Sequence, residues 1–131
     1  MRLSQTVDVL VSEEAMRTRR SKGAVVEALA DEALRARLFP GIAFRGADWE
    51  RRPWVIGTAL DVWQMVDAHR DLGSVEQMVK EGNIVERHIR LALAYYARFP
   101  EEIDEAIVRN RRPLSELQAD FPFIDVITAG R

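Results

Sequence analysis

Few residues of this 131-residue chain have the chemistry of a catalyst or a metal ligand. The chain contains no cysteine, which excludes disulfides, thiol catalysis and cysteine-based zinc sites. Its two histidines, His69 and His88, lack the His-Glu-x-x-His spacing of zinc proteases. We therefore expect both to be surface or half-buried side chains. The sequence also lacks a glycine-rich phosphate loop and a Gly-x-Ser-x-Gly elbow.

Carboxylates recur along one predicted helix, at Asp61, Asp67 and Asp71. A metal-dependent nuclease would need such acids to converge on one ion, whereas helical carboxylates usually face solvent. The three tryptophans are more typical of cores and interfaces than of ligand stacking: Trp49, Trp54 and Trp63. We therefore predict that the chain is not an enzyme and uses no metal and no cofactor.

The charges are distributed unevenly, although the net charge is only −2. Residues 1–37 hold seven Lys/Arg and six Asp/Glu, whereas residues 60–110 hold six and ten. Binding to DNA must therefore depend on a local basic patch, and the acidic part suits a basic protein partner. No apolar run is long enough to span a membrane and no secretory signal is present. These features predict a soluble bacterial protein of the cytoplasm.

Two short amphipathic helices are expected in the first 37 residues. Ser4 can cap a helix with an apolar stripe from Val7 to Ala15, and Ser21 can cap a second helix with a stripe from Val25 to Leu34. Helices this short cannot bury their stripes alone, so two copies should pack together.

A short strand, a helix and a serine-capped helix form a ribbon-helix-helix-like outline. In a strand over residues 1–4, Leu3 would face the core and Arg2 would face the DNA bases. The amides of Ser21, Lys22 and Gly23 would bind a phosphate at the second helix N-terminus. The predicted strand is shorter than usual for this type of unit. The alternative is a helical hairpin that only dimerises.

A β-hairpin is expected after the turn at Phe39-Pro40-Gly41, with strands over residues 42–46 and 54–56. Its tip would gather three arginines that contact DNA phosphates, in the manner of a wing: Arg45, Arg51 and Arg52. The alternative is a solvated hairpin loop.

Three helices are expected after the hairpin. The first covers residues 60–71, the second is a short helix from residue 75 that ends at Gly82-Asn83, and the third runs from residue 84 or 85 onward with Tyr96 facing inward. Ser74 and Gln77 form a capping box, and Gly82 is expected to supply a left-handed cap. The last two helices have a helix-turn-helix outline. Its recognition face would carry Arg87, His88 and Arg90, with Glu81 and Glu86 beside them. The alternative is a scaffold that packs three helices.

The C-terminal region begins with a helix from Pro100 to about Asn110. Residues 121–127 are unusually apolar for a chain terminus and therefore need a surface to cover them. They are expected either to fold back or to lie in a groove of a partner protein.

Part of the chain resembles a known family. Pro-Trp-Val-Ile-Gly-Thr at residues 53–58, followed by Leu-Asp-Val-Trp at residues 60–63, resembles the signature of the bacterial "domain of unknown function 433" family. The likeness continues at residues 73–77 and 89–96 and covers residues 42–108. This resemblance implies a winged helix-turn-helix fold and the role of antitoxin in a VapBC-type toxin–antitoxin pair.

Together these observations predict a mainly α fold with three parts. They are a ribbon-helix-helix-like arm for dimerisation and DNA binding (residues 1–38), a small winged helix-turn-helix domain (residues 42–110) and a partner-binding C-terminal tail (residues 111–131). The resemblance implies the function of a type II antitoxin that neutralises a PIN-like ribonuclease toxin, and the arm adds the prediction that the chain binds operator DNA as a homodimeric autorepressor. The alternatives are a stand-alone dimeric transcriptional regulator without a toxin, and an enzyme or small-molecule-binding domain near Trp54 and Trp63.

The predicted binding residues fall into two groups. The DNA-binding residues are Arg2, Ser21, Lys22, Gly23, Arg45, Arg51 and Arg52. The residues predicted to bind the toxin are Arg111, Arg112, Phe121, Phe123, Ile124 and Ile127, with Arg111 or Arg112 pairing the toxin's acidic metal-binding cluster.

Overall fold

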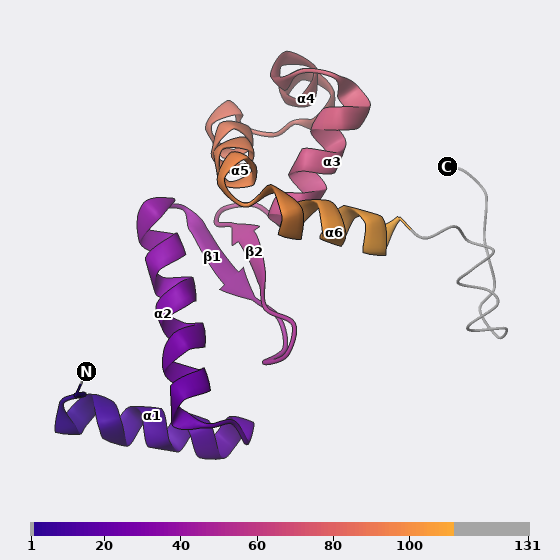
Figure 1. The fold of residues 1–131 in the computed structure, drawn as a ribbon. Helices are drawn as coiled ribbons and strands as arrows, with labels where there is room; N and C mark the ends of the chain where they lie inside the picture. The colour runs from indigo at the N-terminus through magenta and orange to yellow at the C-terminus, as the bar shows by residue number, and fades with distance from the viewer. Residues whose placement is uncertain (1, 112–131) are drawn as a thin grey trace, which may run out of the picture.

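The computed structural model of the chain describes residues 2–111 (Figure 1). This part is 67% helical and contains one two-stranded antiparallel sheet, which confirms the prediction of a mainly α fold. The elements are α1 (Gln5–Thr18), α2 (Lys22–Leu38), β1 (Ile42–Arg45), β2 (Arg52–Val55), α3 (Val62–Leu72), α4 (Val75–Gly82), α5 (Glu86–Arg98) and α6 (Pro100–Asn110). None of these helices is long and apolar enough to cross a membrane.

The arm consists of α1 and α2, and both helices begin at the predicted serines. The Ser4 hydroxyl oxygen accepts a hydrogen bond from the Val7 amide (3.3 Å), and the Ser21 hydroxyl oxygen accepts one from the Ala24 amide (3.1 Å). The first helix ends at Arg19, which adopts a left-handed conformation (φ 56°). As a result α1 lies crosswise at the foot of α2, and α2 rises from it toward the rest of the molecule (Figure 1).

The arm has a very small core of its own. Val11, Ala15 and Val25 are its buried residues, and Leu3 and Val26 pack against them. Four large apolar side chains of the predicted stripes are exposed in the single chain: Val7, Leu10, Leu29 and Leu34.

Strands β1 and β2 form the predicted hairpin, in which Ile42 pairs with Val55 and Arg45 with Arg52. The returning strand was predicted over residues 54–56, but it begins two residues earlier and ends at Val55. It ends there because Gly57 turns the chain with a positive φ (94°) toward the start of α3.

The junction between β2 and α3 is fixed by hydrogen bonds within a few residues. The Trp54 indole donates to the carbonyl oxygen of Thr58 (2.7 Å). The Thr58 hydroxyl donates to the Val55 carbonyl (2.9 Å) and accepts from the Leu60 amide (3.0 Å). This compact turn places Asp61 at the N-cap of α3.

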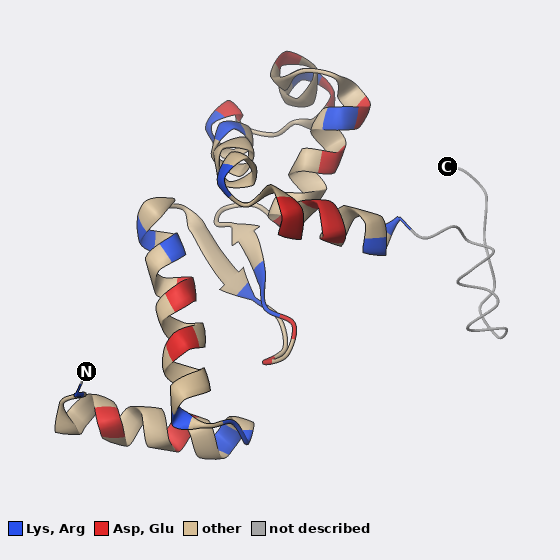
Figure 2. Ribbon diagram, in the orientation of Figure 1, with Lys and Arg blue, Asp and Glu red and all other residues tan. Residues whose placement is uncertain are grey.

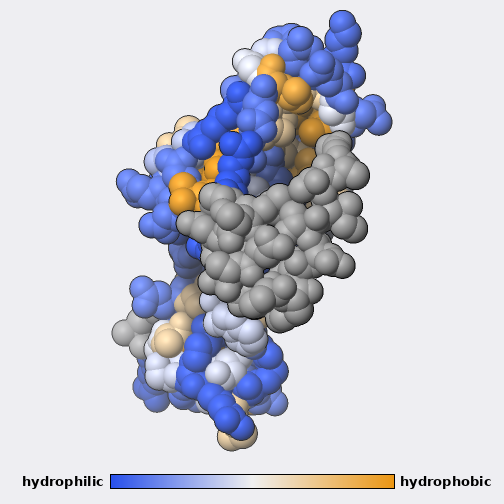
Figure 3. Space-filling view, turned by 90° about the vertical axis from the view of Figure 1, so that its right-hand side faces the viewer, coloured by the Kyte–Doolittle hydropathy of each residue, from blue (hydrophilic) through white to orange (hydrophobic). Residues whose placement is uncertain are grey.

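Helices α3 to α6 pack with the hairpin around the main core, which forms the body of the molecule. Its fully buried side chains include Val55, Met65, Met78, Ile89 and Tyr95. On the side drawn in Figure 3, hydrophobic residues are also exposed over the body, whereas the visible surface of the arm is mainly hydrophilic.

Two predictions for the helices of the body are wrong in detail. Tyr96 was expected to face inward, but Tyr95 occupies the core. Tyr96 is half-buried, and its hydroxyl donates to Asp104 (2.8 Å) and accepts from Arg70 (2.7 Å). The left-handed cap of α4 is Asn83 (φ 53°) instead of Gly82, because the helix continues one residue further and asparagine also tolerates this conformation.

Arg35 on α2 joins the arm to the body. Its guanidinium donates to the Tyr95 hydroxyl (3.0 Å) and to Glu102 (2.6 Å), and it stacks over the Phe99 ring at 3.9 Å from the centroid. Burial raises the pKa of Tyr95 to about 12, so the phenol stays neutral. Asp31 on the same helix also accepts from Arg35.

Candidate functional site

The arm residues predicted to bind DNA lie at the surface. Residues 2–4 have irregular backbone, so the strand predicted over residues 1–4 is wrong for this part of the single chain. A ribbon strand needs a second strand to pair with, which one chain does not supply. The Arg2 side chain is exposed beside the start of α1.

At the N-terminus of α2, the Ser21 hydroxyl already accepts from the third amide of the helix. The amides of Lys22 and Gly23 belong to the first turn, which has no intrahelical acceptors. A Cβ added at Gly23 would meet open space, so this turn is accessible. The Lys22 ammonium pairs with Asp8 of α1, so its charge is partly neutralised within the arm.

The arginines of the hairpin are not free. Arg45 donates to one carboxylate oxygen of Asp61 (2.9 Å) and Arg52 donates to the other (2.7 Å). Asp61 is only 4% exposed, so two guanidiniums compensate one buried carboxylate. The Arg45 guanidinium also lies 5.1 Å from the centroid of the Trp54 ring. These contacts fix the hairpin to the start of α3.

Arg51 binds in a different direction, toward the arm. Its guanidinium donates two hydrogen bonds to Glu32 (both 3.1 Å) and one each to the carbonyl oxygens of Gly46 and Phe44 (3.0 Å). The three predicted wing arginines are therefore divided between two acidic partners, Asp61 and Glu32. A DNA phosphate would have to compete with these carboxylates for all three.

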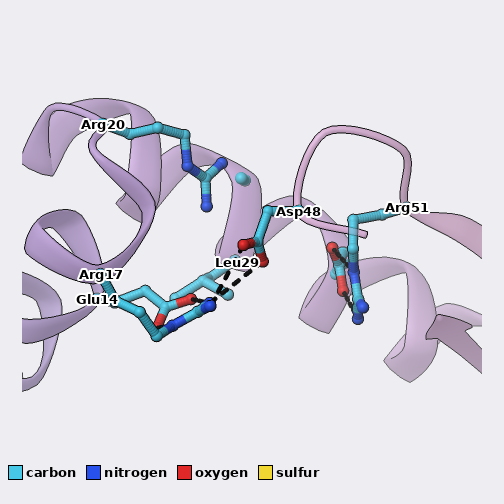
Figure 4. A pocket seen from close by; sticks show the side chains of 8 residues that line it. Glu14, Arg17, Arg20, Leu29, Asp48 and Arg51 are labelled. Carbon is cyan, nitrogen blue, oxygen red and sulfur yellow. Dashed lines mark hydrogen bonds and ion pairs between the residues drawn. The ribbon is translucent and has the colours of Figure 1, made fainter. Parts of the chain in front are cut away.

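A polar cleft of about 220 Å³ separates the α1–α2 corner from the loop of the hairpin (Figure 4). Arg17 of α1 crosses it and donates to both Glu14 (2.6 Å) and Asp48 (3.1 Å). These hydrogen bonds lower the pKa values of both carboxyls. The cleft is lined by three arginines and three carboxylates, so it is electrically balanced: Arg17, Arg20, Arg51, Glu14, Glu32 and Asp48.

Helix α4 is capped by Asn83, and α5 begins at Glu86. On α5, Arg90 pairs with Glu86 (2.6 Å) in an exposed ion pair, and Arg87 is exposed. His88 is half-buried, and its ring would contact a Cβ added at Gly57. The face predicted to read DNA therefore carries basic and acidic side chains together.

Arg111 is the one predicted toxin-binding residue within the described part of the chain. It pairs with two carboxylates of α3, at 3.2 Å from Asp67 and 2.8 Å from Asp71. Arg112, Phe121, Phe123, Ile124 and Ile127 lie outside the described residues. Arg111 must therefore break its ion pairs with Asp67 and Asp71 before it can bind a toxin carboxylate.

The carboxylates singled out in the sequence do not converge on one point. Asp61 binds the hairpin arginines, whereas Asp67 and Asp71 bind Arg111. Within residues 2–111, no group of three or more His, Asp or Glu side chains has an arrangement that could hold a metal ion.

Two features were missed in the sequence. The joining role of Arg35 depends on side chains 60 and 67 residues away, for which the sequence gives no signal. Trp49, in the loop of the hairpin, is 86% exposed. Its position between Asp48 and Glu50, in a charged turn, was the available signal that it would not enter the core.

Comparisons with the models of known protein families, with curated proteins and with solved structures found no match. The residues that the structure describes define a mainly helical protein with a two-helix arm and one β-hairpin.

Proposed function

We propose that the chain is a homodimeric antitoxin of the type II class, which represses its own operator and neutralises a PIN-like ribonuclease. In this proposal the arm has a ribbon-helix-helix-like role, and the body is a winged helix-turn-helix domain. The resemblance of residues 42–108 to the 433 family is the source of the toxin–antitoxin assignment.

The observation that best supports the proposal is the exposed apolar surface of the arm. Leu10 and Leu34 are 59% and 60% exposed, beside a core of three small or branched residues. A second copy would cover these leucines and thereby complete the arm. Residues 1–37 hold seven basic and six acidic side chains, so two arms would not repel each other. A dimer would also present two equivalent DNA-binding faces, as a two-fold operator requires.

Within such a dimer, the accessible first turn of α2 is the better candidate for a phosphate contact. The hairpin arginines are engaged by Asp61 and Glu32, whereas Lys22 is held by the single exposed carboxylate of Asp8. Arg2 is exposed as well. DNA binding through the arm therefore breaks fewer intramolecular contacts than binding through the hairpin.

Duplex DNA from upstream of the chain's own gene tests this arm. Lys22→Ala should weaken binding and lower the slope of log affinity against log salt by about 1, because it removes one phosphate contact. Arg2→Ala should weaken binding by about 1–3 kcal/mol and reduce the preference for the operator over unrelated DNA, because it removes a base contact. Asp8→Asn should strengthen binding, because it frees Lys22. Arg98→Ala, at the C-terminal end of α5 and outside the arm, is the control. Unchanged affinity, operator preference and salt slope in both arm variants would exclude the arm as the DNA-binding element.

Deletion of residues 121–131 tests the role of antitoxin and separates it from that of a stand-alone regulator. The truncated chain should remain dimeric and bind DNA, but it should no longer inhibit the ribonuclease encoded by the neighbouring open reading frame. RNA cleavage by that ribonuclease is the measurement. A full-length chain with Phe121→Ser and Phe123→Ser serves as the second variant. Full inhibition by both variants would contradict the proposal, and loss of the dimer would indicate that the segment packs on its own domain.

A further inference from the structure

Trp49 is the most exposed large apolar side chain of the described residues, at 86%. It lies in the loop that joins β1 to β2, and neither the dimer nor the DNA contacts proposed above use it. An indole in water is unusual because tryptophan buries a large apolar surface when it finds a partner. Tryptophan is also among the residues most enriched at the energetic centres of protein interfaces.

The loop that carries Trp49 is held in one conformation. Gly46 has a positive φ (117°), and a Cβ there would collide with the carbonyl oxygen of Glu50. The Glu50 amide donates to the Ala47 carbonyl (2.9 Å), which closes the turn. Asp48 is bound by Arg17, and Arg51 is bound to Glu32. The backbone that carries the indole is therefore fixed before binding, which lowers the entropic cost of a contact.

The two sides of this loop differ in charge. On the α1 side lies the balanced cleft of three arginines and three carboxylates (Figure 4). On the α2 side, a second cleft of about 280 Å³ is bordered by Trp49 itself and by Phe44. Its charged lining is four carboxylates and two arginines: Asp31, Glu32, Asp48, Glu102, Arg35 and Arg51. Figure 2 shows the acidic residues of the hairpin loop beside the acidic turns of α2.

We propose that the acidic cleft beside Trp49 binds an arginine- or lysine-bearing segment of a partner protein. A guanidinium or ammonium placed over the indole would make a cation–π contact. It would share the carboxylates of the cleft with the arginines that already bind them. Nucleic acid does not fit, because these carboxylates repel phosphates. This assignment deepens the proposed function by giving the chemistry of the protein partner, and it rests on that function only in requiring such a partner.

The probe is a fluorescently labelled nine-residue peptide of alternating arginine and glycine, whose anisotropy is measured with the full chain at low ionic strength. Trp49→Ala should weaken binding by about tenfold, the loss expected for an interface anchor. Asp31→Asn should weaken it by about threefold, because it removes one charge and leaves Arg35 held by Glu102. Trp49 and Asp31 are both exposed, so neither change should alter the fold.

Two control variants match these changes outside the cleft. Val108→Ala removes an apolar side chain that is 72% exposed on α6, and Glu81→Gln removes an exposed carboxylate on α4. Both should bind the peptide as the unaltered chain does, and a glutamate–glycine peptide should not bind. Equal weakening by Trp49→Ala and Val108→Ala would overturn the proposal, as would the absence of peptide binding.

A sedimentation measurement separates this inference from the proposed function. Trp49→Ala should leave the dimer and DNA binding intact, because the surfaces proposed for both lie on the arm. Dissociation of the dimer by Trp49→Ala would overturn the inference by assigning Trp49 to the contact between two copies. If peptide binding depends on Trp49 but the chain binds no DNA and inhibits no ribonuclease, the proposed function is contradicted. The assignment of the cleft as a binding site for a basic segment then still holds.

Discussion

The double variant Leu10→Asp with Leu34→Asp should be a folded monomer at micromolar concentrations at which the unaltered chain is a dimer. In the proposed dimer these side chains become buried, so each copy would have to bury two carboxylates without partners. We expect the dissociation constant to rise roughly a hundredfold, or about 3 kcal/mol. Both positions are more than half exposed in the single chain, so the helices should form as before.

Sedimentation equilibrium measures the mass, and far-ultraviolet circular dichroism checks that the helical content is kept. Val108→Asp is the control, because it places one such carboxylate on an exposed apolar position of α6. A dimer of unchanged stability in the double variant would show that α1 and α2 do not form the contact between copies. A monomeric unaltered chain would remove the basis of the proposed function.

Asp61→Ala should cause the largest loss of stability among single charge removals in the body. The carboxylate is 4% exposed and binds Arg45 and Arg52 through separate oxygens. Without it, two guanidiniums face each other at the loop end of the hairpin with no counter-charge. Removing one partner of a fully buried ion pair costs roughly 3–5 kcal/mol. These arginines are partly hydrated, with side chains 34% and 45% exposed, so we expect about 2–3 kcal/mol.

Urea denaturation measures this change in the free energy of unfolding. Glu86→Ala is the matched control, because it removes one carboxylate from the exposed Glu86–Arg90 pair and should change stability by about 0.5 kcal/mol or less. If Asp61→Ala is as mild as this control, the hairpin is held by its apolar residues alone. The result would also show that the two arginines are available to other ligands.

The helices of this chain could be predicted closely because their signals are local. Ser4, Ser21 and Ser74 each supply a cap within three residues of the amide they bind, and Pro100 occupies the first turn of α6. The hairpin followed from two short apolar runs around a charged turn. Errors of one or two residues occurred where helix and strand ends depended on the neighbouring turn, as at Asn83 and Val55.

The partners of the arginines could not be predicted in the same way. The sequence placed Arg45, Arg51 and Arg52 together at a wing tip, but Arg51 binds Glu32, 19 residues earlier, and the other two bind Asp61. A long side chain can reach many positions, and its partner depends on which carboxylate the packing of other elements brings near. The sequence also could not predict which of the two neighbouring tyrosines, Tyr95 or Tyr96, is buried. Tyr95 contacts Arg35 of α2 and Glu102 of α6, and these contacts form only when the helices pack together.

The amino-acid sequence by itself determined the helices, their caps, the hairpin and the two apolar stripes of the arm, because each follows from residues close together in the chain. The tertiary structure alone decided which charges are already paired, which apolar side chains stay uncovered and how the arm is fixed to the body through Arg35. These properties depend on contacts between distant segments, which form only when the whole chain is packed. They leave Leu10, Leu34 and Trp49 exposed to solvent as the surfaces that a second molecule would cover.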